Sequence, residues 1–436
     1  MARFKVGIFG AGRGREIAKD FLMLGCEIVA ICDFDIERRN NMVETLELKD
    51  ALLFEDFEEF FKVEMDIMVL TNYFHEHAPY AIRCLEKGIH VYSECISNGT
   101  MAEGVALMEA AEKSDAVYML AENYPQGRFN IEMMNTCKSG KLGKIVYAEG
   151  EYVHPANPAN SKETKALRGH KNHWRNWLPV SYYVTHSIGP LMRATDATPQ
   201  RVCAFAAFAE PEYREADAVQ VKDITAIITT YNDDRSVFKV TGCAGYGHAR
   251  CSYRFCGTKG QTENLRQNNF EVCTNYNSWQ VPEGEECRSK KVIEWNDPDN
   301  DKILKSGHSG SDYVTARMFI DCIEKGEQPP FPFNVDGGIA MSSVAILAHR
   351  SILEGGKPYE IPNFREEKWK EIYRNDTLCP MPLTDGTMPS IACNSIPGYE
   401  PTKEQIENFE KAMGTVTGPK ASIPTYGLPG YEDEKK

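Results

Sequence analysis

This sequence of 436 residues lacks the signatures of several protein classes. No apolar run approaches the roughly 20 residues that a membrane-spanning helix needs. The N-terminal stretch MARFKVGIFGAG shows no basic region followed by an apolar segment and a small-residue cleavage site, which a secretory signal would have. We therefore expect a cytoplasmic chain without a membrane partner.

Positive charge is also scarce. Lys and Arg number 49 against 63 Asp and Glu, so the formal net charge is -14. An acidic chain repels phosphate backbones and anionic surfaces, and we expect no nucleic-acid partner. Hydrophobic residues make up 42% of the chain, which indicates a globular protein with a sizeable core. The length suggests two or three domains of roughly 100–200 residues each.

The 14 cysteines include no C-x-x-C pair, and the closest spacings are Cys251 with Cys256 and Cys26 with Cys32. Several others, such as Cys84, lie in apolar patterns. We interpret them as reduced thiols that fill the core, and we expect no bound metal. The histidines at 154, 170 and 173 leave a metal site open as an alternative to solvated loop residues.

Strand and helix patterns alternate over the first part of the chain. Strands are predicted at Phe4–Phe9, Glu27–Cys32, Asp66–Leu70, His90–Ser93 and Ala116–Leu120, and helices from about Arg15, at His77–Lys87 and at Met101–Lys113. Such alternation predicts a parallel sheet covered on both faces, in a domain of residues 1–123.

The pattern then changes. A helix at 126–138 precedes predicted strands at Lys144–Val153, Val202–Phe208, Ile224–Tyr231, Ser236–Val240 and Ser252–Phe255, with later helices at Tyr313–Lys325 and Gly338–Glu354. This predicts an α+β domain over 124–375 with an open, mostly antiparallel sheet. Residues 376–436 are rich in Pro, Gly and Thr, and we expect an extended C-terminal arm.

A glycine-rich turn follows the first predicted strand. Gly10, Gly12 and Gly14 let the backbone approach a pyrophosphate, with Arg13 between them, and the amides of the next helix hold the anion. Asp33 ends the second strand, where an acid accepts hydrogen bonds from the adenosine ribose and repels a 2′-phosphate. This predicts an N-terminal Rossmann domain that binds NAD. The alternative is a flavodoxin-like domain in which Asp33 caps a helix.

Further motifs resemble those of the Gfo/Idh/MocA oxidoreductases over about residues 3–370. They are Gly10–Gly14, Asp33, Asn72-Tyr73-Phe74-His75-Glu76-His77 and Lys87-Gly88-Ile89-His90-Val91-Tyr92-Ser93-Glu94. The resemblance implies that His77, Glu94, Cys95 and Asn123 line the nicotinamide ribose, and that the chain forms a homo-oligomer, a dimer or tetramer, on its open sheet. The family usually reads Glu-Lys-Pro at Glu94-Cys95-Ile96, and its lysine often lies beside the reacting hydroxyl.

A branch that also lacks this lysine, the NAD-dependent glycosidases of glycoside hydrolase family 109, is similar to this chain in later motifs. These are Glu122-Asn123, Glu151-Tyr152-Val153-His154, His173-Trp174-Arg175, Tyr183-Val184-Thr185-His186-Ser187-Ile188-Gly189-Pro190, Gly257-Thr258-Lys259-Gly260 and Gly307-His308-Ser309-Gly310-Ser311-Asp312. By that resemblance the substrate is a small sugar or glycoside.

The resemblance also implies an indirect reaction. NAD⁺ takes hydride from a sugar C3 hydroxyl, a base removes the acidified C2 hydrogen, the C1 oxygen is eliminated, water adds and NADH returns the hydride. Tyr152 and His186 match the proton-transfer groups. Sugar-binding residues would be Arg175, Tyr183, Tyr246 and His308.

Other interpretations stay open. If the oxidised product were released, the enzyme would be a sugar dehydrogenase or glycoside 3-oxidase. If the protein had no catalytic activity, it would be a sugar or cofactor sensor. Tyr152 would be plain packing in an alternating strand, and His186 a helix cap. Cys95 is either a reactive thiol or a small neutral filler, and His308 either reaches the sugar or holds a turn.

Overall fold

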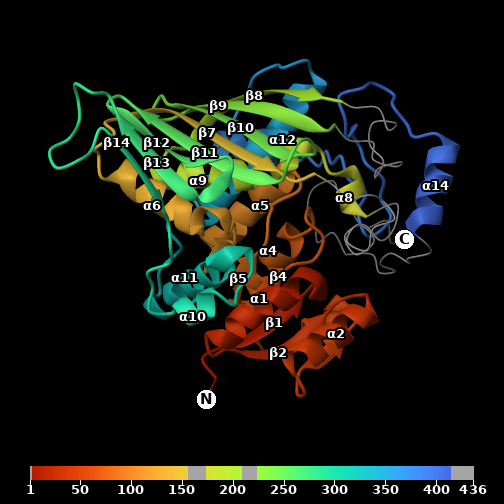
Figure 1. Cartoon of the computed structure of the whole chain (residues 1–436). Helices are drawn as coiled ribbons and strands as arrows, with labels where there is room; N and C mark the ends of the chain where they lie inside the picture. The colour runs from red at the N-terminus through yellow and green to blue at the C-terminus, as the bar shows by residue number, and fades with distance from the viewer. Residues whose placement is uncertain (1, 156–172, 209–222, 414–436) are drawn as a thin grey trace.

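Two β-sheets, each with its own helices, organise the chain (Figure 1). The structure is a computed structural model that describes residues 2–155, 173–208 and 223–413. A six-stranded sheet belongs to the N-terminal part and a nine-stranded sheet to the part that follows. The predicted fold class, a Rossmann domain followed by an α+β domain, is confirmed.

The first sheet is entirely parallel, in the order β3-β2-β1-β4-β5-β6. Its strands are β1 (Lys5–Phe9), β2 (Glu27–Cys32), β3 (Leu52–Phe54), β4 (Ile67–Leu70), β5 (His90–Ser93) and β6 (Tyr118–Leu120). Its helices are α1 (Ala11–Met23), α2 (Ile36–Leu46), α3 (Phe57–Phe60), α4 (Ala78–Glu86) and α5 (Met101–Glu112). The strand order reverses between β1 and β4, and the crevice at the carboxyl ends of these strands is where such sheets bind ligands.

Burial on both faces explains why the central strands were predictable. Every residue of β4 and β6 is buried, so both read as continuous apolar runs. The sequence did not predict β3, an edge strand whose Leu52 and Leu53 are exposed.

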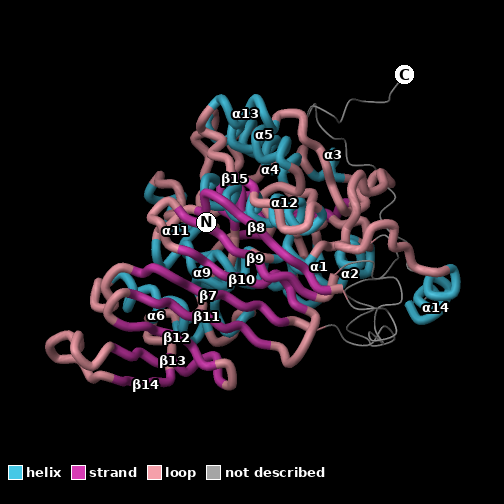
Figure 2. The backbone as a smooth tube through the Cα atoms, turned by 90° about the horizontal axis from the view of Figure 1, so that it is seen from above, coloured by secondary structure: helices cyan, strands magenta, loops and turns pink. Residues whose placement is uncertain are grey.

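The second sheet has the order β14-β13-β12-β11-β7-β10-β9-β8-β15, and only β7 and β10 pair in parallel (Figure 2). Its strands are β7 (Ile145–Val153), β8 (Pro199–Ala207), β9 (Thr225–Asn232), β10 (Val237–Ala244), β11 (Arg250–Gly257), β12 (Gly260–Leu265), β13 (Asn268–Tyr276), β14 (Arg288–Val292) and β15 (Tyr359–Glu360). The prediction of a mostly antiparallel sheet is confirmed, although β12 to β15 were not anticipated.

Helices cover one face of this sheet and leave the other open (Figures 1 and 2). α6 (Arg128–Lys138), α9 (Thr185–Thr195) and α12 (Val335–Leu353) pack on it and join it to the Rossmann domain. The remaining elements are η1 (Tyr124–Gln126), α8 (Trp174–Trp177), η2 (Val180–Tyr183), α10 (Asn300–Ile303), η4 (His308–Gly310), α11 (Ser311–Lys325), α13 (Glu367–Tyr373) and α14 (Lys403–Met413).

The segment after α13 contacts both domains. Thr384 donates to the buried carboxylate of Glu76, in the loop between β4 and α4, from its backbone N (2.7 Å) and its Oγ1 (2.8 Å). Further along, the backbone N of Ser395 donates to Asp223, next to β9, at 3.0 Å. The described part of the predicted arm is therefore fastened to both domains.

The structure also bears on the expectations about membrane-spanning helices and cysteines. No helix among the described residues has both the length and the apolar character needed to cross a membrane. All cysteines are free thiols; most are buried, and only Cys287 is exposed.

Candidate active site

The turn between β1 and α1 requires glycine. Gly10 has φ of 100°, and a methyl group there would lie 2.3 Å from the carbonyl oxygen of Thr71. A methyl group at Gly14 would lie 2.5 Å from Cγ2 of Ile8. Because α1 begins at Ala11, the N-terminal end of this helix lies beside this close approach, an arrangement suited to a pyrophosphate.

Gly10→Ala is expected to weaken NAD binding at least about 10-fold and to destabilise the protein by about 1–3 kcal/mol, because the turn must deform. NAD titration followed by calorimetry and a thermal unfolding curve measure the two effects. Gly25→Ala is the matched control: Gly25 has φ of 84° with nothing within 4 Å of the added methyl. Unchanged NAD affinity in Gly10→Ala would contradict the assignment of this turn.

Asp33 lies at the end of β2 with its carboxylate directed at the turn. It accepts hydrogen bonds from the backbone N of Ala11 (2.7 Å) and of Asp35 (2.9 Å). Burial raises the pKa of Asp33, and these hydrogen bonds oppose the rise. Asp35, not Asp33, caps α2. The flavodoxin-like alternative is therefore wrong, both in its cap and in its strand order.

Three polar atoms around the crevice are buried without a hydrogen-bond partner among the described residues: Oδ1 of Asn72, Nε2 of His77 and Oδ1 of Asn123. His77 is held through its other ring nitrogen, 3.1 Å from the carbonyl oxygen of Ile96. Buried polar groups are rarely left without partners, so such orphans indicate a polar ligand. The residues present fit a nicotinamide nucleotide.

A network of charged residues links the glycine turn to the second domain. Nε of Arg13 donates to Glu94 at 2.8 Å, and both terminal nitrogens of Arg13 donate to Asp312 on α11 at 2.8 Å. Asp312 also accepts from Nδ2 of Asn123 at 2.7 Å and lies 2.9 Å from Nδ1 of His308. Burial alone would raise the pKa of Asp312, but Arg13 and His308 outweigh burial and hold it well below its usual range.

Glu122, directly after β6, forms the core of a second cluster. Its carboxylate is fully buried and lies 2.8 Å from Nδ1 of His186 on α9, while Sγ of Cys95 donates to it at 3.0 Å. Burial opposes ionisation, but His186 and the hydrogen bonds outweigh it, so the pKa of Glu122 is lowered. A carboxylate on Nδ1 fixes the tautomer of a histidine and leaves Nε2 available for chemistry.

Three tyrosine rings surround His186. Its ring centroid lies 4.7 Å from that of Tyr152 on β7, 4.7 Å from that of Tyr183 in η2 and 4.4 Å from that of Tyr124 in η1. Burial raises the pKa of the Tyr152 phenol, and the charge of Arg175 partly opposes this. Tyr152 is therefore a neutral phenol beside the ring of His186, a pair able to give and take protons.

The other predicted sugar-binding residues lie at different distances from this cluster. The Arg175 guanidinium lies 5.9 Å from the Tyr183 ring centre, and the His308 ring lies 6.1 Å from that of Tyr124. Tyr246 follows β10 and is 38% exposed. Among the described residues, no ring contact or hydrogen bond joins Tyr246 to the cluster.

The two described histidines among those considered for a metal site, His154 and His173, contact other side chains or the backbone. His154 stacks on Tyr152 with ring centroids 5.6 Å apart. His173 is buried, and its Nδ1 accepts from the backbone N of Arg175 at the start of α8. His170 lies outside the described residues.

Sequence reasoning left Glu122, Asp312 and Phe74 out of the candidate residues. Phe74 stacks on Trp174 (4.9 Å) and on Tyr183 (5.0 Å) and so joins the Rossmann domain to the second domain. All three lie inside motifs already noted, and for Glu122 and Asp312 the available signal was a carboxylate within such a motif.

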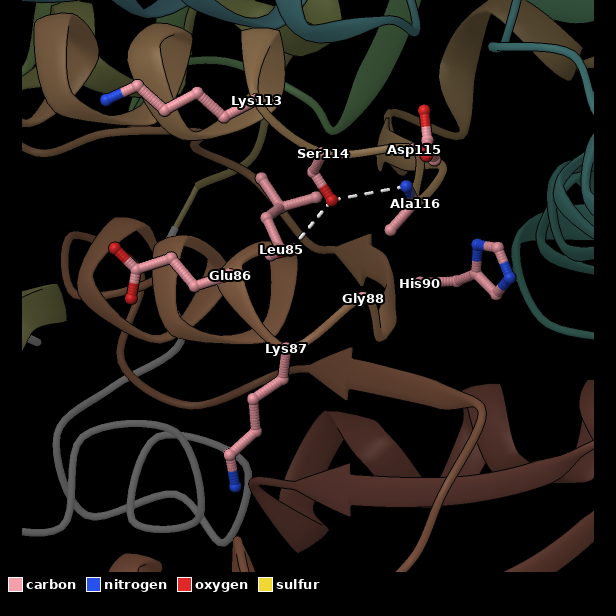
Figure 3. Close-up of a pocket in the computed structure, with 9 residues that line it drawn as sticks. All are labelled: Leu85, Glu86, Lys87, Gly88, His90, Lys113, Ser114, Asp115 and Ala116. Atoms are coloured by element: carbon pink, nitrogen blue, oxygen red, sulfur yellow. Dashed lines mark hydrogen bonds between the residues drawn. The ribbon is translucent and has the colours of Figure 1, made fainter.

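The pocket in Figure 3 lies elsewhere. It measures about 470 Å³ and is formed where α4 and α5 end, beside His90 at the start of β5. Oγ of Ser114 donates to the carbonyl oxygen of Leu85 and accepts from the backbone N of Ala116 within it. This is the amino-end edge of the parallel sheet, opposite to the crevice that holds the predicted residues.

Comparison with known proteins agrees with this geometry. Residues 4–122 match the family model of the Gfo/Idh/MocA oxidoreductase family, NAD-binding Rossmann fold. The N-terminal domain is therefore an NAD-binding Rossmann domain of the Gfo/Idh/MocA oxidoreductase kind, and the chain is an NAD-dependent enzyme. Residues 223–371 match the model of the glycosyl hydrolase 109 C-terminal domain, so the second domain is of that kind.

Curated proteins similar to this chain are named glycosyl hydrolase family 109 proteins. The chain is 23% identical over 401 residues to a glycosyl hydrolase family 109 protein of Shewanella pealeana, with 85% of this chain and 87% of the relative covered. It is also 23% identical to family 109 protein 1 of Bacteroides thetaiotaomicron, covering 84% and 86%.

Solved structures share the fold. A levoglucosan dehydrogenase in complex with NADH and levoglucosan superposes with a TM-score of 0.69 at 16% identity, covering 82% of this chain and 99% of that one. An aldose-aldose oxidoreductase from Caulobacter crescentus gives a TM-score of 0.64 at 14% identity, covering 82% and 99%.

Proposed function

We propose that this enzyme cleaves a small glycoside by transient oxidation at C3 of its sugar. The observation that carries the proposal is the buried pair of Glu122 and His186, placed against Tyr152 and beside Cys95. By the resemblance described above, Cys95 takes the position of the family's usual lysine. Without that lysine, His186 is the base within the cluster, and it accepts protons in the elimination as well as in the oxidation.

In this proposal NAD, when bound, supplies a hydride acceptor that is regenerated within each cycle. His186 takes the C3 hydroxyl proton at Nε2, while Glu122 stabilises the resulting imidazolium through Nδ1. His186 passes this proton to solvent and then takes the C2 hydrogen as a proton. Tyr152, a neutral phenol at rest, donates its proton to the departing C1 oxygen and recovers it from the water that adds at C1, while His186 returns its proton to C2. Arg175 stabilises the phenolate form between these two events.

The substrate class follows from the rings around His186. Tyr124, Tyr152 and Tyr183 offer the aromatic faces on which the apolar faces of sugars stack, and Arg175 supplies hydrogen bonds to hydroxyls. The names of the similar proteins, a glycosyl hydrolase family and a levoglucosan dehydrogenase bound to its sugar, support a small sugar or glycoside. Asp33 supports NAD over NADP.

A second candidate is net oxidation of a sugar or of the C3 position of a glycoside. The solved neighbours favour it, since several are sugar dehydrogenases. Incubation with nitrophenyl glycosides in deuterated water without added NAD separates the two. Release of nitrophenol with deuterium at C2 and no net NADH supports cleavage; NADH or a 3-keto product supports net oxidation. Saturable sugar binding without any turnover would mean a sensor.

We also propose that the open face of the nine-stranded sheet joins two copies of the chain. Ile227 and Tyr231 of β9 are 50% and 43% exposed on this face, and Phe205 of β8, the register partner of Ile227, is 65% exposed. Exposed apolar patches of this kind mark protein contacts.

Ile227→Glu is therefore expected to shift the protein from oligomer to monomer, because the new carboxylate would be desolvated in the interface. Sedimentation velocity at several concentrations measures the shift. Leu304→Glu, at a site that is 65% exposed beside α10 and away from the sheet, is the control. A wild-type chain that sediments as a monomer throughout would refute the interface.

A further inference from the structure

We infer that Cys95, Glu122 and His186 form a binding site for one zinc-type divalent cation, and that occupation of this site inhibits the enzyme. The three residues come from different elements: the loop after β5, the end of β6 and α9. Cation binding rests only on their geometry. The inhibition rests in addition on the proposed role of His186 as a base.

The ligand atoms already lie close together. Sγ of Cys95 is 3.0 Å from Oε2 of Glu122, and Nδ1 of His186 is 2.8 Å from Oε1. All three atoms lie within 4.8 Å of one another, and all three side chains are buried. Zinc bonds of about 2.0–2.3 Å place neighbouring ligand atoms roughly 3–4 Å apart, so small side-chain adjustments suffice. Three protein ligands with an open fourth position is a common zinc arrangement.

The chemistry of the donors selects the cation. Thiolate and imidazole prefer zinc or cobalt, whereas magnesium and calcium prefer oxygen ligands. A lysine at position 95 would repel any cation beside Glu122, so the site depends on the thiol of Cys95.

Charge also favours occupation. The carboxylate of Glu122 brings negative charge into the buried cluster, and the thiol of Cys95 donates to it. On binding, the S–H bond of Cys95 breaks, a sulfur–metal bond forms and one proton leaves to solvent. The proton on Nδ1 of His186 moves to Nε2, which frees Nδ1 for the metal. A dication with a thiolate and a carboxylate is neutral, and neutral clusters are the ones that tolerate burial.

Occupation would stop proton transfer at His186. With Nδ1 bound to metal and Nε2 protonated, the imidazole has no free lone pair with which to accept the C3 hydroxyl proton. Glu122, bound to the same cation, no longer stabilises an imidazolium. The cation therefore inhibits because it occupies the same imidazole that must accept the substrate proton.

Cobalt titration of the full-length, NAD-loaded protein tests the site. We expect one cobalt per chain by equilibrium dialysis, a sulfur-to-cobalt charge-transfer band in the near ultraviolet and release of one proton per metal in an unbuffered indicator assay. Cys95→Val should abolish the band and lower affinity more than about 100-fold, since even outer-shell changes around metals cost 10–100-fold. Cys287→Ser, at the exposed thiol, is the control and should change nothing.

Absence of the charge-transfer band in the wild-type protein overturns the site, as does a band that persists in Cys95→Val. Glu122→Gln keeps the thiol but loses the carboxylate and should also weaken binding; thermal unfolding curves show that each variant is folded. Zinc is then added to the turnover assay and removed with chelator. Binding without reversible inhibition would reject the role of His186 in the proposed function and leave the cation site standing.

Discussion

Replacing His186 with Ala is expected to slow turnover at least about 100-fold, the usual scale of acid–base assistance, and Tyr152→Phe is expected to do the same. The buried carboxylate of Glu122 lies 2.8 Å from Nδ1 of His186, and the Tyr152 ring lies edge-on to the imidazole with centroids 4.7 Å apart. These are the two groups to which the proposed function gives proton transfer. Each change removes one proton-transfer group and leaves the glycine turn untouched.

Steady-state kinetics with the best nitrophenyl glycoside measure the loss, and NAD titration shows that the cofactor still binds. Two matched variants separate chemistry from general damage. Tyr147→Phe alters the same strand β7 at a residue paired with Glu149 on the open face, and His248→Ala removes an exposed histidine. Near-wild-type rates for Tyr152→Phe or His186→Ala would remove that residue from the active site.

Asp312→Ala is expected to lower the free energy of unfolding by about 3–5 kcal/mol, the cost of removing one partner from a buried ion pair. Asp312 is 1% exposed and accepts two hydrogen bonds from Arg13 and one from Asn123. Its loss leaves charge buried between the two domains. Chemical denaturation measures the effect.

Asp336→Ala, which breaks an exposed pair with Arg365, is the control and should cost at most about 1 kcal/mol. A similar small cost for Asp312→Ala would show that the network does not hold the domains together.

The same network gives stability a pH dependence. The folded pKa of Asp312 lies below its unfolded value of about 3.9, so its contribution is present above that pH and is lost as pH falls further. Burial alone would lower the pKa of His308, but Asp312 outweighs it and raises the pKa. That contribution is present below about pH 6.5 and fades as pH rises through the folded pKa. Thermal midpoints of Asp312→Asn should depend less on pH in both ranges.

Local patterns carried much of the fold and part of the site. The sequence predicted the buried strands β4 and β6, the glycine turn at Gly10 and the change to alternating strands after Asn123. Each of these depends on residues that are neighbours in the chain. The sequence did not predict the edge strand β3, because an exposed strand of three residues is too short to give a recognisable pattern.

The candidate residues divide in the same way. Tyr152, His186 and Arg13 were named from their motifs, and the structure places each in a cluster of partners. Tyr246 was named with them, but its position in an exposed loop gives it no described contact with that cluster. Spacing along the chain cannot tell a loop that turns toward a site from one that turns away.

By itself, then, the sequence determined the Rossmann domain and the preference for NAD and indicated the family, because each of these is carried by short motifs that can be read along the chain. Only the tertiary structure decided that Cys95 and His186 share the buried carboxylate of Glu122, and that Arg13 meets Asp312 from 299 residues away. Such contacts arise from the packing of three separate elements around one crevice. The charge and hydrogen-bond partners that set their chemistry exist only after folding.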